Sequence, residues 1–99
     1  MPTAKSKARI LVVDDEAAQM RALCDTLPAE DYDAVGFTDA RSALAELQRT
    51  KCDLLLADLM MPGMDGIELL RAAREIDPHL VGIIMTGDGT IATAVEAMK

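Results

Sequence analysis

The segment LLLADLMMPGMDG, residues 54–66, decides the fold class of this chain. An apolar run ends at a carboxylate, Asp58, and a loop of Met, Pro and Gly then leads to Asp65 and Gly66, where a helix is expected to begin. A short apolar run bounded by turn residues is typical of a strand that is buried on both faces. Partial loss of hydration makes a carboxylate costly in this position unless another group compensates for it. The neighbours of Asp58 in the fold must therefore explain why it is tolerated.

The composition indicates one small domain with an aliphatic core. The chain has 99 residues, of which 51% are hydrophobic, but it contains no Trp, one Tyr and one Phe. Its two cysteines, Cys24 and Cys52, form neither a disulfide framework nor a metal-binding pattern, and we expect both to be buried thiols. The sequence shows no secretory signal and no apolar segment of transmembrane length, so we expect a cytoplasmic protein.

The charge distribution excludes two classes of partner. The formal net charge is −7, and three of the ten cations lie in the first nine residues, so residues 10–99 carry seven cations against seventeen acids. Nucleic acids and anionic membranes bind basic surfaces, so we expect neither to contact this domain directly. An acidic surface is compatible with bound cations.

Apolar strands and amphipathic helices are predicted to alternate along the chain. After a flexible tail at residues 1–8, the expected strands are residues 9–13, 32–37, 53–57 and 80–85, and the expected helices include residues 16–27, 40–47, 67–76 and 91–98. Short connections between such elements imply right-handed crossovers. We therefore predict an α/β fold with a doubly wound parallel sheet and helices on both faces.

Polar residues follow three of the predicted strands. Asp14 and Asp15 follow the first strand, Asp58 follows the third, and Thr86 and Gly87 follow the fourth. The carboxyl ends of parallel strands lie along one edge of the sheet, where ligands bind in such folds. With the second strand outermost, the first and third strands are neighbours. The three carboxylates should then lie within a few ångströms of one another.

Three carboxylates in one pocket repel one another, so either some are protonated or a cation neutralises them. A site with only oxygen ligands suits a hard ion, and Mg²⁺ fits a site that retains several waters. A carboxylate beside Mg²⁺ can also accept a phosphoryl group, a transfer that needs mainly positioning and charge neutralisation. In this interpretation Mg²⁺ bridges Asp15, Asp58 and the phosphoryl oxygens. Thr86 could donate a hydrogen bond to a phosphoryl oxygen, and the small Gly87 leaves room for the group.

The segments LVVDDE, LLLADLMMPGMDG and IIMTG, in this order and spacing, resemble the receiver domain of two-component response regulators. The resemblance covers residues 9–99 and implies a flavodoxin-like fold with strand order 2-1-3-4-5. It implies that Asp58 accepts a phosphoryl group from the phosphohistidine of a sensor histidine kinase or phosphotransfer protein. It also implies that Asp15 binds Mg²⁺ directly, that Asp14 does so mostly through water, and that the backbone carbonyl of Met60 is a further ligand.

The resemblance also implies how the signal leaves the site. Thr86 would be a switch hydroxyl that turns towards the phosphoryl group and reshapes the loop and helix that follow, residues 87–98. This surface would control a downstream output. Such a chain would be a phosphoacceptor that assists its own phosphorylation and dephosphorylation, and not a turnover enzyme.

One departure from the family pattern concerns the C-terminal part. The pattern continues with a fifth strand, a Lys at its end and a fifth helix, and these would fall beyond Lys99. We therefore expect a C-terminally incomplete receiver domain with strand order 2-1-3-4. Its fourth strand would be an exposed apolar edge, which favours a homodimer or a strand-swapped dimer.

Two other functions compete with a phosphoacceptor. An interaction module could keep this fold and bind partners without phosphorylation. A magnesium-dependent aspartyl-phosphate phosphatase shares the acid chemistry, but it would need a D-x-D pattern where this chain has adjacent Asp14 and Asp15. The roles of Asp65 and Glu68 are explained by a helix-capping box alone, and His79 is expected on the surface.

Overall fold

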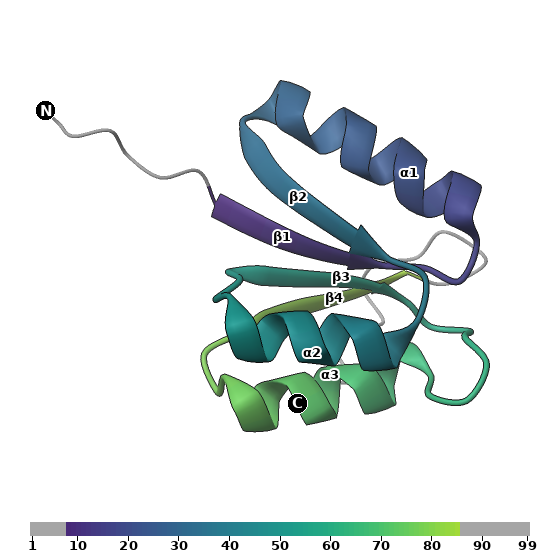
Figure 1. The fold of residues 1–99 in the computed structure, drawn as a ribbon, viewed down its shortest axis with the longest axis vertical. Coiled ribbons are helices and arrows are strands. Elements are labelled where there is room, and N and C mark those ends of the chain that lie inside the picture. Colours follow the sequence, from purple (N-terminus) through teal and green to yellow (C-terminus); the bar gives the residue numbers. More distant parts are fainter. Residues whose placement is uncertain (1–7, 86–99) are drawn as a thin grey trace, which may run out of the picture.

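The computed structural model describes residues 8–85, which form a four-stranded sheet with helices on both faces (Figure 1). The elements in chain order are β1 (Ala8–Val13), α1 (Ala17–Thr26), the short 3-10 helix η1 (Leu27–Glu30), β2 (Tyr32–Phe37), α2 (Ala40–Arg49), β3 (Leu54–Asp58), α3 (Gly66–Ile76) and β4 (Val81–Met85). The predicted tail at residues 1–7, Thr86, Gly87 and the predicted helix 91–98 lie outside the described residues. Ala8, which was predicted to belong to the tail, instead begins β1 and pairs with Tyr32.

The sheet has the order β2-β1-β3-β4, and all three pairings are parallel. This confirms the predicted doubly wound α/β architecture and the order 2-1-3-4. Val13 at the end of β1 pairs with Phe37 on one side and with Ala57 on the other, while Asp58 pairs with Met85. The register therefore brings the carboxyl ends of all four strands to the same edge of the sheet.

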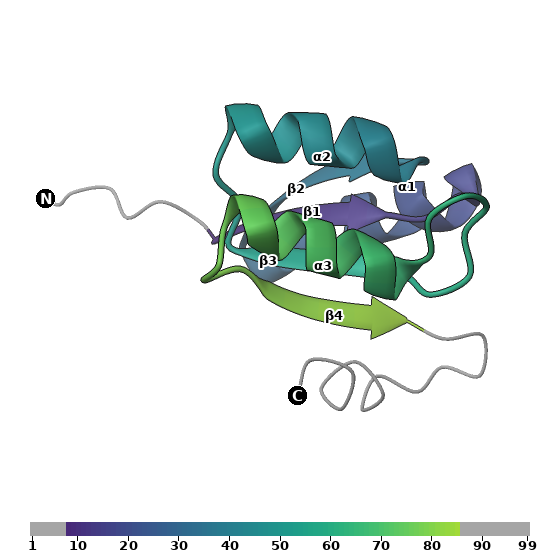
Figure 2. The ribbon, with the colours of Figure 1, turned by 90° about the horizontal axis from the view of Figure 1, so that it is seen from below.

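The two faces of the sheet are covered differently. Helix α1 lies on one face, whereas α2 and α3 lie side by side on the other (Figures 1 and 2). Alternate strand residues point towards α2 and α3, as the period of a strand requires. They form one core cluster with residues of those two helices: Leu11, Val13, Leu55, Ala57, Ile84, Ala40, Ala43, Leu47, Leu69, Leu70 and Ala73, among others. This cluster fixes the strands that carry the acids.

Local sequence signals explain where the helices begin. The Asp39 carboxylate accepts a hydrogen bond from the backbone N–H of Ser42 at 2.8 Å and caps α2. Asp65 and Glu68 form the capping box that the sequence predicted for α3, with bonds of 2.8 and 3.0 Å. Helix α3 therefore begins at a defined residue, Gly66, directly after the loop that follows Asp58.

Helix α1 is less buried than its sequence pattern indicates. It contains no fully buried residue, and Cys24 is only half-buried, so the prediction of a buried thiol is wrong at this position. Cys52 is 1% exposed, as predicted. Burial raises the pKa of both thiols, although the Arg9 guanidinium beside Cys52 opposes the increase there.

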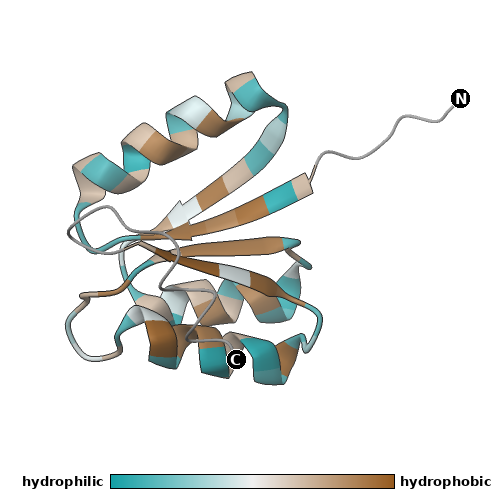
Figure 3. Cartoon of the chain, turned by 180° about the vertical axis from the view of Figure 1, so that it is seen from behind, coloured by the Kyte–Doolittle hydropathy of each residue, from teal (hydrophilic) through white to brown (hydrophobic). Residues whose placement is uncertain are grey.

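Strands β3 and β4 are mainly hydrophobic along their length, as Figure 3 shows, and β4 forms one edge of the sheet within residues 8–85. Val81 on this strand is 53% exposed. None of the helices between residues 8 and 85 has the length and hydropathy that a membrane crossing requires.

Candidate functional site

Three carboxylates from two neighbouring strands meet at the carboxyl edge of the sheet. Asp14 and Asp15 directly follow β1, and Asp58 is the last residue of β3. One carboxylate oxygen from each residue lies within 4.8 Å of the other two. Because β1 and β3 are hydrogen-bonded neighbours, the backbone holds Asp58 beside Asp14 and Asp15, although more than forty positions separate it from them in the sequence.

Asp14 is the most deeply buried of the three, at 1% exposure. Its backbone N–H donates to the Phe37 carbonyl at 3.1 Å, which ties it to β2. Its Oδ1 accepts a hydrogen bond from the backbone N–H of Glu16 at 2.9 Å, an arrangement in which an Asp side chain caps its own turn. The Asp14 side chain is thus fixed before α1 begins. It does not belong to the first turn of α1, which contains no acidic residue.

Asp58 is half-buried and electrostatically unfavourable as an anion. Burial raises the pKa of its carboxyl above the ordinary value, and the charges of Asp14 and Asp15 raise it further. The backbone N–H groups of Leu59 and Met60 oppose this shift as hydrogen-bond donors. Two amides therefore offset part of the repulsion, but the balance still disfavours the charged form of Asp58.

The described part of the chain supplies no cation to this cluster. The ion pairs of Lys, Arg and His among residues 8–85 all lie elsewhere, around Arg9, Arg49 and Glu46. Oxygen ligands within 4.8 Å of one another, with excess negative charge, are the donor set that a hard divalent cation prefers. The residues present therefore fit Mg²⁺.

Met60 lies in the loop between Asp58 and Gly66, and its side chain is 71% exposed. The loop turns at Gly63, whose φ of 83° favours glycine. It is attached at both ends, because the Leu59 N–H donates to Met85 at 2.8 Å and the Gly66 N–H donates to the Leu59 carbonyl at 3.0 Å. Thr86 and Gly87, the remaining predicted site residues, lie outside the described residues.

Comparison with known proteins identifies the family. Residues 10–99 match the family model of the response regulator receiver domain. The chain belongs to this family.

This receiver domain is 41% identical over 92 residues to the response regulator protein FleR of Pseudomonas aeruginosa, and the match covers 93% of the chain and 20% of FleR. It is 42% identical over 84 residues to the response regulator receiver protein CpdR of Brucella abortus, covering 85% of the chain and 70% of CpdR. A crystal structure of a Burkholderia pseudomallei response regulator has a TM-score of 0.79 and 25% identity, covering 93% of the chain and 54% of that protein. That structure is described as containing a phosphorylated aspartic acid, a calcium ion and citrate.

The receiver domain therefore functions in phosphorylation-based two-component signalling. Receiver domains are generally switches that interact with histidine kinases or phosphotransfer proteins. The match spans about a fifth of the length of FleR.

Two features of the site were not predicted from the sequence. One is the near-complete burial of Asp14. The adjacent strand end and helix start were a signal for it, because an Asp can accept a hydrogen bond from the backbone amide two residues further on, here that of Glu16. The other is the lowering effect of the Leu59 and Met60 amides on the pKa of Asp58, which no side-chain pattern reveals.

Proposed function

We propose that this receiver domain accepts a phosphoryl group on Asp58 from a phosphohistidine of a sensor histidine kinase or phosphotransfer protein. A carboxylate oxygen of Asp58 attacks phosphorus, the phosphorus–oxygen bond forms and the phosphorus–nitrogen bond breaks. The electron pair of the broken bond stays on the imidazole nitrogen, which then takes up a proton. The product is an acyl phosphate.

The observation that supports this proposal is the convergence of Asp14, Asp15 and Asp58 within 4.8 Å without a cation from the described chain. A purely structural cluster of acids would be stabilised by cationic partners, as Asp33 and Glu46 are by Arg9. The neighbour from Burkholderia pseudomallei, with its phosphorylated aspartic acid and calcium ion, has the same fold and supports the same chemistry.

We assign Asp14, Asp15, Asp58 and the backbone carbonyl of Met60 as the residues that would hold Mg²⁺. When bound, the ion would neutralise the carboxylates and the charge on the phosphoryl oxygens. Asp14 has the role of a fixed acid, because its other contacts prevent it from moving towards solvent. The Met60 amide lowers the pKa of Asp58 and would be available to an added phosphoryl oxygen, whereas the Leu59 N–H is bonded to the Met85 carbonyl.

The output of the switch is proposed to pass through Thr86, with Gly87 leaving space for the phosphoryl group and the segment 91–98, predicted from the sequence to be a helix, transmitting the change. The chain would act in the cytoplasm as a switch that assists its own phosphorylation and dephosphorylation, without turning over a separate substrate. We further propose that a homodimer or strand-swapped dimer can form along β4, whose Val81 is exposed.

Intact mass spectrometry after incubation with Mg²⁺ and a small acyl-phosphate donor tests the proposal. We expect one added phosphoryl group on the parent chain and none on Asp58→Asn or in the absence of Mg²⁺. Asp65→Asn is the matched control, because Asp65 lies in the same segment but serves the capping box. It should still be phosphorylated. Incorporation into Asp58→Asn would overturn the assignment, and no incorporation into any chain would favour a module that works without phosphorylation.

A further inference from the structure

Gly66 lies in unusually close contact with the backbone that carries Asp58. A Cβ atom placed on Gly66 would come 2.6 Å from the Asp58 carbonyl oxygen and 3.1 Å from the Leu59 Cα. Both are backbone atoms, so they cannot rotate away as the end of a side chain can. The first residue of α3 must therefore be glycine for the helix to approach β3 this closely.

The same residue makes a directed hydrogen bond to the loop. The Gly66 N–H donates to the Leu59 carbonyl at 3.0 Å. The capping box of Asp65 and Glu68 fixes the beginning of α3, so this donor is presented by a rigid element. On its other side, the Leu59 N–H is held by the Met85 carbonyl at 2.8 Å.

The Leu59 carbonyl and the Met60 N–H belong to one peptide unit. That unit is planar and trans, so the two groups point in opposite directions. When Gly66 holds the carbonyl on the α3 side, the Met60 N–H is directed to the opposite side of the peptide unit, away from α3. In agreement with this direction, the Met60 amide lowers the pKa of the Asp58 carboxyl. The orientation of this donor is thus set from a helix that itself does not touch the carboxylates.

We infer that Gly66 is a positioning residue for the acid site: its lack of a side chain and its N–H together orient the Leu59–Met60 peptide unit towards Asp58. The inference rests on the proposed function of Asp58, which it extends to a residue outside the metal ligands. Gly66 touches neither the metal nor the phosphoryl group and acts through Met60.

A close-packed glycine beside a different helix provides a matched control. A Cβ atom at Gly36 would come 2.3 Å from the Met20 Sδ. Met20 belongs to α1, which covers the face of the sheet opposite to α3. Gly36→Ala therefore tests the effect of added bulk without pressing on α3.

Two readouts separate positioning from stability. Residual dipolar couplings of the Met60 N–H, measured without metal, report its orientation directly. We expect this coupling to change in Gly66→Ala and to remain at the parent value in Gly36→Ala. In parallel, calorimetric titration should show a Mg²⁺ dissociation constant about tenfold higher in Gly66→Ala, the usual effect of losing an outer-shell contact, and unchanged in Gly36→Ala.

A second variant covers the case in which Gly66→Ala fails to fold. Chemical synthesis can replace the Gly66 amide with an ester, which removes the N–H donor and adds no atom that could clash. The Met60 coupling should change in this chain as well. A folded Gly66 variant with the parental coupling and parental Mg²⁺ affinity would overturn the inference, as would equal losses in Gly36→Ala. If the parent chain binds no Mg²⁺, the proposed function fails, while the coupling still decides whether Gly66 orients the loop.

Discussion

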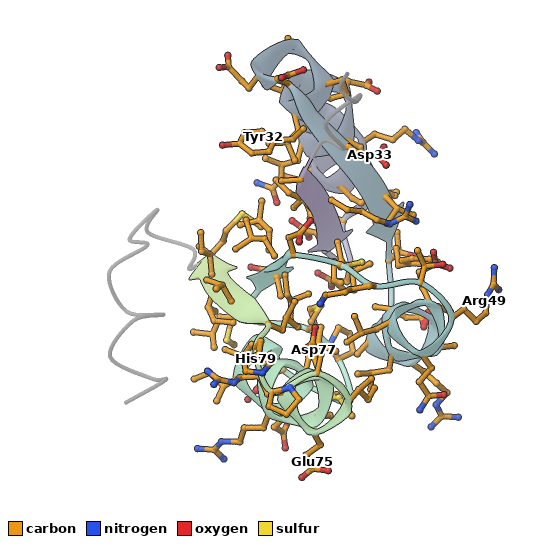
Figure 4. The ribbon with its side chains drawn as sticks, turned by 90° about the vertical axis from the view of Figure 1, so that its left-hand side faces the viewer. Tyr32, Asp33, Arg49, Glu75, Asp77 and His79 are labelled. Carbon is orange, nitrogen blue, oxygen red and sulfur yellow. The ribbon has the colours of Figure 1, made fainter. Side chains whose placement is uncertain are left out.

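The two edges of the sheet carry similar numbers of acids, but the acids of one edge are paired with a cation and those of the other are not. At the amino edge, the Arg9 guanidinium contacts Glu46 at 3.0 Å and Asp33 at 3.6 Å, and its backbone N–H donates to Asp53 at 2.8 Å. At the carboxyl edge, Asp14, Asp15 and Asp58 face one another without an ion pair from the described residues. Figure 4 looks onto the amino edge, with Asp33 on β2 and Arg49 extending outward from α2.

The difference separates acids that stabilise the fold from acids that are available for chemistry. At the amino edge, one cation links β1, β2 and α2, so the charges contribute to stability. At the carboxyl edge the chain retains a repulsive cluster that raises the pKa of Asp58. Strain of this kind is typical of functional sites, where a ligand supplies the missing interaction. His79 and Asp77 also lie at the amino edge (Figure 4), where the backbone N–H of His79 donates to the Asp77 carboxylate at 3.0 Å. This exposed histidine is therefore at the opposite edge of the sheet from the acid cluster.

The largest expected effect comes from removing the cation of the amino edge. Arg9→Met should lower the free energy of unfolding by about 2 kcal/mol, because Glu46 is largely buried and would keep only the more distant and exposed Arg49 as a partner. Urea denaturation at neutral pH measures this value. A loss below about 0.5 kcal/mol would show that the amino edge does not depend on Arg9.

Adding a cation to the carboxyl edge should have a slightly smaller effect. At a Mg²⁺ concentration ten times the dissociation constant, the parent chain should gain about 1.4 kcal/mol of stability through mass action. Asp15→Asn should lose most of this gain, because one ligand charge is removed. Urea denaturation in Ca²⁺-free buffer, with and without Mg²⁺, measures the gain in unfolding free energy for both chains. An equal gain in Asp15→Asn would contradict the assignment of the site.

Removing a charge from the carboxyl edge should stabilise the metal-free chain. The pKa of Asp58 is raised in the folded state, so the folded state binds the proton more tightly than the unfolded chain does. Its favourable contribution is therefore complete below the ordinary carboxyl pKa of 3.8 and is lost as the pH rises through the raised value. Asp58→Asn should be about 1 kcal/mol more stable than the parent at neutral pH, the scale of one close charge repulsion in a water-like medium.

The pH dependence is the control for this prediction. In a chelating buffer, the advantage of Asp58→Asn should disappear when the pH falls below the ordinary carboxyl range, where both chains are neutral at this position. Thermal or urea unfolding across this interval tests the sign. A variant that is less stable than the parent at neutral pH would show that the Leu59 and Met60 amides outweigh the repulsion.

The smallest effect is expected at the rim of the amino edge. Arg49 approaches Glu46 at 3.7 Å, but its side chain is 77% exposed. Arg49→Met should change the unfolding free energy by no more than about 0.5 kcal/mol, as for most exposed ion pairs. Both Arg9→Met and Arg49→Met remove one positive charge beside Glu46. Comparing the two losses shows whether the burial of the ion pair decides its contribution to stability. A loss equal to that of Arg9→Met would contradict this explanation.

Most of the architecture followed from local signals that the sequence displays openly. The alternation of apolar strands and amphipathic helices predicted the parallel sheet, and Asp65 with Glu68 predicted the start of α3. Burial along α1 was harder to predict, since apolar spacing gives the direction of a helix face but not the amount of structure packed against it. Cys24 is half-buried for this reason.

The sequence by itself determined which residues stand at the strand ends, because a buried apolar run and the polar residue that ends it are local features. It therefore specified Asp14, Asp15 and Asp58 as the candidate acids and predicted the edge where they meet. Only the tertiary structure decided that Asp14 is buried and hydrogen-bonded, that the pKa of Asp58 is raised, and that Gly66 must approach the backbone of Asp58. These properties depend on the distances between segments that are far apart in the sequence. The packing of β1, β3 and α3 sets those distances, and no local sequence pattern encodes them.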